Sequence, residues 1–437
     1  MVFYTRIFFR AKGNMLNHST QHLLLAKVNA KQNSSFYGCL HKSATSMFVV
    51  GICIATPAQA QLNSEVLRPF LGLYGNYDSN VLGLNSPEAA LASNGSRALS
   101  DTSWTAYAGV DYRQLFGRQT VTANVSRSRT AFDRLSQLDY RGENFSSDLA
   151  WQLGNYWNGN AGFTRAVALA PFTDFHGLES NTIASARRHA SAAWRFHPAW
   201  QVHAEVSRYA IDYSVLLQSQ YDRTENQGVL GVDYTSRAGS TFGVRWRSLD
   251  GRFPNQILGT SGLANDYRQH QLELKSDWQF SGKSRVNFLG SVVSRLHNVL
   301  PERDFRGYNG RMTLTTAVGG ATSLTAAAWR ETGIFDDVST AYSTNRGAQL
   351  GARWSATSKF TVEGSAKREY RDFTRSLRFS TLPDYRDVLH TNQLTLKYLP
   401  LDRLNMEFIL FSSGKANNSG IGGYARHGAS FSSRYMF

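Results

Sequence analysis

The chain has 437 residues, with 47 Lys and Arg against 32 Asp and Glu, and only two cysteines. Both cysteines, Cys39 and Cys53, lie in the first 60 residues, which the sequence predicts to be removed, so the mature chain has no disulfide and no thiolate metal site. The rest contains no heptad array, no Pro-rich or Ser-rich linker and no apolar run long enough for a membrane-spanning helix. These features argue against a chain of several soluble domains.

The N-terminal segment has the layout of a secretory signal peptide. Lys42 precedes the apolar run 47–55 and the small-residue site 58–60, which predicts cleavage after that site. The long stretch in front of the run indicates either an extended signal or a start codon placed too early. Residues 1–60 hold six of the 47 basic residues and no acidic one, so the mature charge is 41 minus 32, or +9. We therefore expect 1–60 to be a signal peptide with an extended leader and 61–437 to form one domain.

From Leu67 onward the chain repeats one pattern, a stretch of about ten residues in which every second side chain is apolar, followed by a connection. The first two strands are predicted at 67–77 and 101–113, and a tight turn at 116–118 leads to a third at 120–130. Long and short connections then alternate to the end of the chain, which gives nine long loops, eight tight turns and about eighteen strands. We expect bulges where the alternation is weak, in the first strand and at 208–216.

This pattern predicts an all-β fold, a transmembrane antiparallel up-and-down β-barrel in a bacterial outer membrane, with both termini on the periplasmic side. Eighteen strands would leave an aqueous lumen. In the last strand, Phe431, Tyr435 and Phe437 share the outward face, and Ser432 and Arg434 the inward one. We expect the strand ending at Phe437 to engage the barrel assembly machinery.

Aromatic side chains on the outward face gather near the tight turns and predict a periplasmic aromatic girdle. The inner face of a soluble β-sandwich is the alternative reading, which the number of strands argues against. The predicted girdle consists of Tyr112, Trp157, Trp194, Phe196, Trp200, Tyr234, Phe242, Trp278, Phe280, Trp354, Phe360, Tyr398 and Phe437.

Eleven arginines lie on the outward face just beyond the apolar stretch, at the opposite end from the girdle. Because guanidinium groups match phosphate geometry, we expect this ring to bind outer-membrane lipid through the phosphates of lipopolysaccharide; solvated rim charge is the alternative. They are Arg127, Arg165, Arg208, Arg330 and Arg368 on ascending strands, and Arg141, Arg188, Arg268, Arg306, Arg346 and Arg386 on descending ones.

The inward face carries ten predicted basic groups against eight acidic ones. We expect wall-to-wall ion pairs that keep the barrel rigid, with a small positive excess that suits a neutral or mildly anionic solute. The basic residues are Arg113, Arg195, Arg245, Arg247, Lys275, Arg311, Arg353, Lys367, Lys397 and Arg434. The acidic residues are Asp111, Asp148, Glu205, Asp233, Glu273, Asp277, Glu363 and Glu407. Three inward aromatics, Tyr107, Trp329 and Phe411, are candidates for stacking on sugar rings or for lumen packing.

No motif predicts catalysis, a cofactor, a metal or nucleic-acid binding. The segment 77–80 has no neighbouring His and reads as a loop with Asx-turn chemistry. His189, His203 and His270 lack ligand spacing, and Gly319-Gly320 lacks the strand-to-helix setting of a phosphate loop. We expect a protein that is not an enzyme.

Five short segments resemble the EpsL family of outer-membrane barrel proteins, which are associated with exosortase-linked exopolysaccharide synthesis. They are Arg68-Pro69-Phe70, Tyr77-Asp78-Ser79-Asn80-Val81-Leu82, Ser100-Asp101-Thr102, Asp139-Tyr140-Arg141-Gly142 and Asp250-Gly251-Arg252-Phe253-Pro254-Asn255. The resemblance covers about 67–437. It implies a role in moving a polysaccharide chain across the outer membrane, together with periplasmic export or synthesis proteins, and it brings no catalytic residues with it.

The sequence therefore favours a barrel that serves exopolysaccharide biosynthesis and export as a passive polymer passage. With no nucleotide site predicted, the drive would come from polymer synthesis or periplasmic partners. A general or sugar-selective porin is the first alternative, and a barrel enzyme that modifies polymer or lipid is the second.

Overall fold

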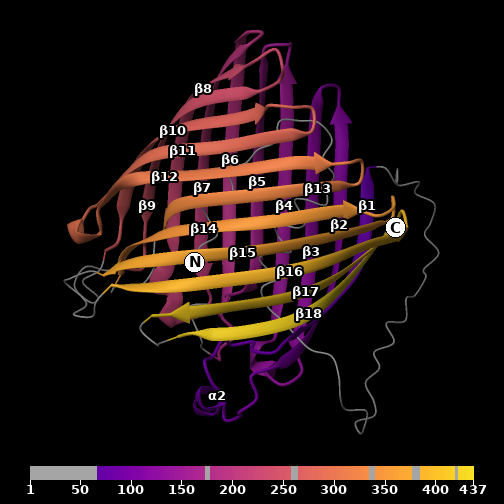
Figure 1. Ribbon diagram of the computed structural model, residues 1–437, viewed down its shortest axis with the longest axis vertical. Helices are drawn as coiled ribbons and strands as arrows, with labels where there is room; N and C mark the ends of the chain where they lie inside the picture. The colour runs from indigo at the N-terminus through magenta and orange to yellow at the C-terminus, as the bar shows by residue number, and fades with distance from the viewer. Residues whose placement is uncertain (1–65, 173–177, 257–263, 334–339, 376–383, 419–421) are drawn as a thin grey trace.

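The computed structural model describes residues 66–172, 178–256, 264–333, 340–375, 384–418 and 422–437, so the predicted signal peptide lies outside the described part. The described residues contain eighteen strands in one antiparallel sheet, in which each strand pairs with its neighbour in the chain and β18 pairs with β1. This last pairing closes the sheet into a barrel. In Figure 1, β10 to β18 run across the view and β2 to β7 stand upright behind them, as expected for tilted strands on opposite walls.

The strands are β1 (Leu67–Asp78), β2 (Asp101–Phe116), β3 (Gln119–Phe132), β4 (Tyr140–Leu153), β5 (Trp157–Leu169), β6 (Thr182–His197), β7 (Trp200–Tyr213), β8 (Arg223–Thr235), β9 (Thr241–Arg252), β10 (Tyr267–Gln279), β11 (Ser284–His297), β12 (Phe305–Val318), β13 (Thr322–Gly333), β14 (Thr340–Ser355), β15 (Phe360–Arg375), β16 (Tyr385–Leu401), β17 (Leu404–Asn417) and β18 (Tyr424–Met436). The helical segments are α2 (Pro87–Asn94), η2 (Ser136–Leu138), η3 (Leu216–Tyr221) and η4 (Pro301–Arg303). Among the described residues, no helix is long and apolar enough to cross a membrane.

The strand number, the alternation of long and short connections and the tight turn at Gly117 agree with the sequence prediction. Gly117 has a φ of 61°, a left-handed conformation that only glycine adopts at little cost. The predicted bulge in the first strand is wrong, because the β1–β18 register runs without interruption from Phe70 to Asp78. The alternation is weak there because Gly72 and Gly75 lie beneath aromatic side chains of β2.

The second predicted bulge, at 208–216, is also absent from the described structure. β7 keeps one register with β6 from Val202 to Tyr213. The alternation weakens at this point because the strand ends at Tyr213 and the short helix η3 begins at Leu216.

The two faces of the strands separate as predicted. On β10, Leu272 and Leu274 are exposed to the outside, whereas Glu273 between them is 2% exposed. The girdle aromatics lie on the outer face and contact one another between strands. Trp157 stacks on Trp194 with ring centroids 5.7 Å apart, and Trp200 contacts Tyr234 with ring centroids 5.1 Å apart.

A small hydrophobic core joins the first three long loops at the extracellular end of the barrel. Helix α2 lies in the first of these loops, with Ser86 accepting a hydrogen bond from the Ala89 amide at its start. In Figure 1 this helix projects beyond the strand ends. The core consists of Val81, Leu82, Phe132, Leu135, Leu138, Leu169 and Phe172.

Four of the long loops are closed by one repeated hydrogen bond, which we call the carboxylate brace. An Asp immediately before a descending strand accepts a bond from the main-chain N–H at the end of the preceding ascending strand, or one residue beyond it in the case of Phe253. The bonds are Phe132 N to Asp139 (2.8 Å), Tyr213 N to Asp222 (2.7 Å), Phe253 N to Asp266 (2.8 Å) and His297 N to Asp304 (2.7 Å). After Asp139, Asp266 and Asp304 comes an inward aromatic and then an outward Arg. The brace thus sets the strand register at the barrel rim.

Removing one brace is expected to destabilise the barrel. In Asp266→Ala the Phe253 amide, on a residue that is 3% exposed, loses its acceptor, which costs about 1–3 kcal/mol of unfolding free energy. Urea unfolding of the refolded barrel in lipid vesicles measures this loss. Asp266→Asn keeps an acceptor oxygen and should lose less, and Asp402→Ala, an exposed change in a periplasmic turn, should lose nothing measurable. Equal stability of the three variants would contradict the brace.

Candidate functional site on the inner wall of the barrel

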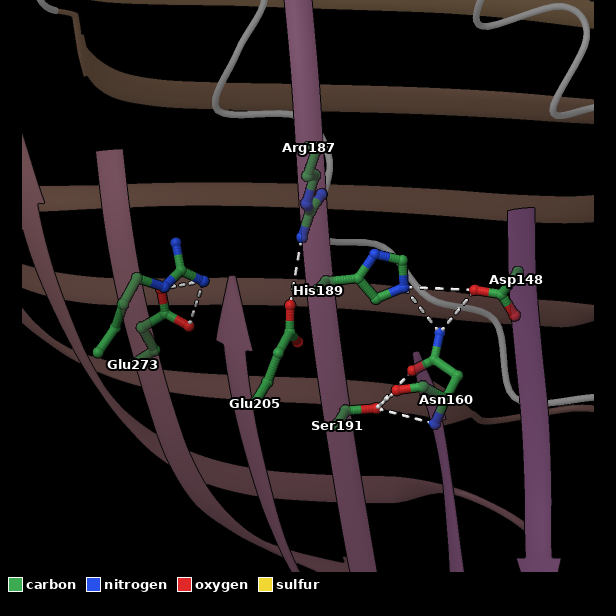
Figure 2. Close-up of polar contacts among 8 residues, drawn as sticks. Asp148, Asn160, Arg187, His189, Ser191, Glu205 and Glu273 are labelled. Carbon is green, nitrogen blue, oxygen red and sulfur yellow. Dashed lines mark hydrogen bonds and ion pairs between the residues drawn. The ribbon is translucent and has the colours of Figure 1, made fainter. Parts of the chain in front are cut away.

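The inner wall is organised by glycines that let long side chains lie flat. In several cross-strand rows, a glycine on the middle strand leaves space for a side chain from one neighbour to reach the other neighbour. We call such a row a glycine lane. Figure 2 shows one of them, in which His189 on β6 reaches across β5 toward Asp148 on β4. The row is Asp148, Gly162 and His189, and a Cβ added at Gly162 would lie 2.6 Å from the His189 ring.

Two further lanes cross β9. Lys275 on β10 lies over Gly243 and places its Nζ 2.7 Å from Asp233 on β8. Tyr267 lies over Gly251 and donates its hydroxyl to Glu225 at 3.0 Å. In each case a polar side chain is drawn along the wall and away from the lumen axis.

The inward aromatic side chains also lie flat over glycines of a neighbouring strand, and this arrangement argues against sugar stacking by Trp329. Trp329 lies over Gly347, is 6% exposed, and has Arg311 and Lys367 within 4.6 and 5.2 Å of its ring. Its faces are therefore covered by the wall and by cations. Phe411 covers Gly428 in the same way.

Tyr107 covers Gly72 and packs edge-on against Phe70, with ring centroids 6.2 Å apart. Its environment therefore matches lumen packing, the second of the two roles expected for the inward aromatics.

Eight of the ten predicted lumenal basic residues form ion pairs. Glu273, 2% exposed, is held between two arginines at 2.8 Å each. The pairs are Arg245 and Arg247 with Glu273, Lys275 with Asp233, Arg311 with Glu331, and Arg353 and Lys397 with Glu363. Lys367 pairs with Glu369, and Arg434 with Asp111. The remaining two, Arg113 and Arg195, lie exposed near the periplasmic ends of β2 and β6.

These ion pairs run along the wall and not from wall to wall. Each joins groups on one strand, on adjacent strands, or on strands with one strand between them. Neighbouring strands lie about 4.8 Å apart, so a long side chain can reach the second strand, whereas the opposite wall of an eighteen-stranded barrel is farther away. The expected rigidity therefore comes from cross-links between neighbouring strands.

The sequence reasoning missed several inward charges. Arg187 pairs with Glu205 at 3.2 Å, as Figure 2 shows, and Arg371 pairs with Glu369 at 3.1 Å. The inward position of Arg187 could have been predicted, because its neighbour Arg188 was assigned to the outer face and successive side chains of a strand point to opposite faces. Glu331 and Glu225 could have been found by the same parity.

A polar cluster in Figure 2 has the residue types of a hydrolytic site without its connections. Ser191 donates to the Asn160 side-chain oxygen, and Asn160 in turn bonds to His189 Nε2 at 3.1 Å and to Asp148 at 3.2 Å. An activated serine needs a base as its hydrogen-bond acceptor, and an amide oxygen is not a base. The geometry therefore gives Ser191 the environment of a wall residue.

The other candidate for chemistry, the segment 77–80, forms the expected turn. The Asp78 carboxylate accepts from the Asn80 amide at 2.9 Å and from Arg426 at 3.2 Å, and the Asn80 side chain holds the main chain of Leu84. Nowhere in the described part of the chain do three His, Cys, Asp or Glu side chains gather in a way that could hold a metal ion.

The eleven rim arginines all lie on the outer face at the extracellular ends of their strands, and all but Arg330 are exposed. Three carboxylates on the outer face each bind two arginines of the rim. Glu143 holds Arg127 and Arg165, Asp250 holds Arg252 and Arg268, and Asp372 holds Arg346 and Arg386. The register also sets arginines directly opposite each other, namely Arg188 and Arg208, Arg330 and Arg346, and Arg129 and Arg141. Arg129 and Arg252 are outward members that the sequence reasoning missed, although parity with Arg127 and Asp250 places them.

Comparison with known proteins agrees with the architecture. The sequence matches no protein-family model and no curated protein. OccK1 (OpdK) from Pseudomonas aeruginosa shares the fold, with a TM-score of 0.50 and 10% identity over 85% of this chain and 99% of that chain. The chain is a β-barrel of the bacterial outer membrane. Its exposed apolar band and its closed sheet meet the requirements of that membrane directly.

Two more solved structures are similar. OccK9 (OpdG) from the same organism has a TM-score of 0.48 and 13% identity, over 85% of this chain and 99% of that chain. The siderophore receptor PirA from Pseudomonas aeruginosa has a TM-score of 0.43 and 11% identity, over 85% of this chain and 80% of that chain.

The glycine lanes predict that a single methyl group can narrow the lumen. A Cβ at Gly347 would lie 2.3 Å from Trp329 and 2.7 Å from the Arg368 carbonyl oxygen, so Gly347→Ala should push the indole off the wall and lower single-channel conductance in a planar bilayer. Gly351→Ala adds the same methyl to the same face of β14, where the nearest atom is 3.6 Å away, and should leave the conductance unchanged.

The double variant Gly347→Ala with Trp329→Ala should restore most of the conductance, because the displaced ring is gone and only the close approach to the Arg368 carbonyl oxygen remains. A conductance that stays low in the double variant would show that the methyl group acts in some other way.

Proposed function

We propose that this outer-membrane barrel takes part in exopolysaccharide export as a passive passage for the polymer. The observation that carries the proposal is the inner wall, where charges pair with one another and long side chains lie in glycine lanes. Such a wall offers many hydrogen-bonding groups and little uncompensated charge. A hydrophilic, weakly charged polymer can enter through repeated weak contacts and still leave, which conduction requires.

The paired charges explain why a weakly charged polymer suits this lumen. Glu273 binds both Arg245 and Arg247, and Glu363 is shared by Lys397 and Arg353. A polyanion would have to compete with these internal carboxylates for the arginines, whereas neutral hydroxyl groups can bond to the wall without breaking a pair.

The segments that resemble the EpsL family have structural tasks in this barrel. Asp101 accepts bonds from two main-chain amides of the second long loop, and Asp139 forms a carboxylate brace. Gly251 belongs to the Tyr267 lane, and Asn255 donates to Asp222 at 2.8 Å. These residues shape the barrel and its loops, and they add no chemistry to it.

In this proposal the barrel is not an enzyme and supplies no energy. Polymer synthesis or periplasmic export proteins supply the drive, and the barrel assembly machinery recognises the last strand, which ends at Phe437. A general or sugar-selective porin is the second candidate, and the fold shared with OccK1 of Pseudomonas aeruginosa favours it. A barrel enzyme is less favoured, because Ser191 bonds to an amide.

Deletion of the gene separates the first two candidates. Export requires that secreted polymer is lost, and that polymer or its precursors accumulate in the periplasm, while uptake of small sugars is unchanged. Complementation with Gly351→Ala should restore secretion, and Gly347→Ala should restore less of it at equal barrel abundance. Slower sugar uptake with normal polymer would favour the porin and contradict the proposal.

Removing a shared carboxylate should change the ion selectivity of the lumen. Glu273→Gln leaves Arg245 and Arg247 without their anion, so the reversal potential in a salt gradient should shift toward anion selectivity. Glu363→Gln, at a more exposed ion pair, should shift the reversal potential in the same direction. This variant replaces Glu273→Gln in the test if loss of the buried Glu273 charge prevents folding. The control, Glu143→Gln, removes the same charge from the outer rim and should leave the ion selectivity unchanged. An equal shift of the reversal potential in all three variants would contradict a paired inner wall.

A further inference from the structure

The outer surface of β11 and β12 carries a shallow hollow at the level of the arginine rim. Its volume is about 570 Å³, and it is lined by Val292, Val293, Ser294, Arg306, Gly307 and Tyr308. These residues form three successive cross-strand pairs. Val292 and Tyr308 point outward and are 67% and 63% exposed, so the floor of the hollow is largely apolar and open to the lipid.

Two arginines border the hollow without a carboxylate partner in the described structure. Arg306 lies two residues from Tyr308 on the same face and is exposed. Arg330 on β13 covers the Tyr308 ring at 4.1 Å and donates to the Tyr308 carbonyl oxygen. Arg330 also stands directly opposite Arg346, and like charges in that position destabilise a strand pair. Asp372 offsets part of that cost at Arg346, and an anion bound at Arg330 would offset more of it.

The hollow lies where the head groups of the outer leaflet meet the acyl chains. A strand tilted by about 45° crosses the apolar band in about ten residues. β12 ends at Val318 beside the periplasmic turn, and ten residues before it is Tyr308. Arg306 therefore lies just outside the band and Val292, opposite Tyr308, lies at its edge.

We propose that this surface binds a phosphorylated glycolipid of the outer leaflet. Its phosphate lies between Arg306 and Arg330, where guanidinium groups can form paired hydrogen bonds, and an acyl chain lies along Val292 and Tyr308. The site is independent of what passes through the lumen. It selects one place in the expected ring of eleven arginines, because here arginines without a carboxylate partner in the described structure adjoin an apolar hollow. Elsewhere several of them share a carboxylate, such as Asp372 between Arg346 and Arg386.

The test measures binding of bis-phosphorylated lipid A to the purified barrel in detergent by native mass spectrometry. Arg306→Ala with Arg330→Ala should weaken binding about tenfold or more, because two charge-assisted contacts are lost. Arg127→Ala with Arg252→Ala removes the same charge from the same rim, at arginines that share carboxylates, and should bind like the wild type. Heat-modifiable migration in gels confirms that each variant is folded.

Three further measurements decide the nature of the ligand. Dephosphorylated lipid A should bind much more weakly, Val292→Asn should weaken lipid A binding by removing the apolar floor, and Arg306→Lys with Arg330→Lys should recover only part of the affinity. Equal binding by the wild type and the Arg306/Arg330 double alanine variant would overturn the proposal. So would an equal loss in the control pair, or inorganic phosphate that competes as well as lipid A.

Discussion

The hydrogen bonds between β1 and β18 close the sheet, and the rest of the molecule depends on that closure. Within lipid no water can satisfy a free strand edge, so an open sheet of these strands could not reside in a membrane. Closure also forces the period-two division of every strand, with apolar groups outside and polar groups inside. The wall chemistry, the aromatic girdle and the arginine rim all follow from that division.

The two faces of the barrel neutralise their charges differently. Inside, a carboxylate such as Glu273 binds two cations and is buried with them, so the wall presents dipoles to the lumen. Outside, Glu143, Asp250 and Asp372 do the same for part of the rim, but Arg306 and Arg330 have no such partner in the described structure. The inner wall is therefore suited to transient contacts, and the segment of the outer rim where these two arginines adjoin an apolar hollow is suited to a lasting one.

The strand count, the order of the strands and the face of each residue could be predicted from sequence, because each needs only local alternation. Glu273 and Leu274 illustrate this, since adjacent residues of opposite polarity define the two faces. The glycine lanes could not be predicted, because the contact of Tyr267 with Glu225 requires the register of three strands, including Gly251. The core under the first three loops was inaccessible for the same reason, since Val81 and Phe172 are far apart in sequence.

Each carboxylate brace joins the ends of two neighbouring strands directly, whatever the length of the loop that connects them. The bonded residues lie seven positions apart at Asp139 and Asp304, nine at Asp222 and thirteen at Asp266, yet the bond is the same. Insertions between the two partners therefore leave the barrel beneath them unchanged. The loops outside the membrane can therefore differ in length and composition while the membrane-embedded cylinder keeps its shape.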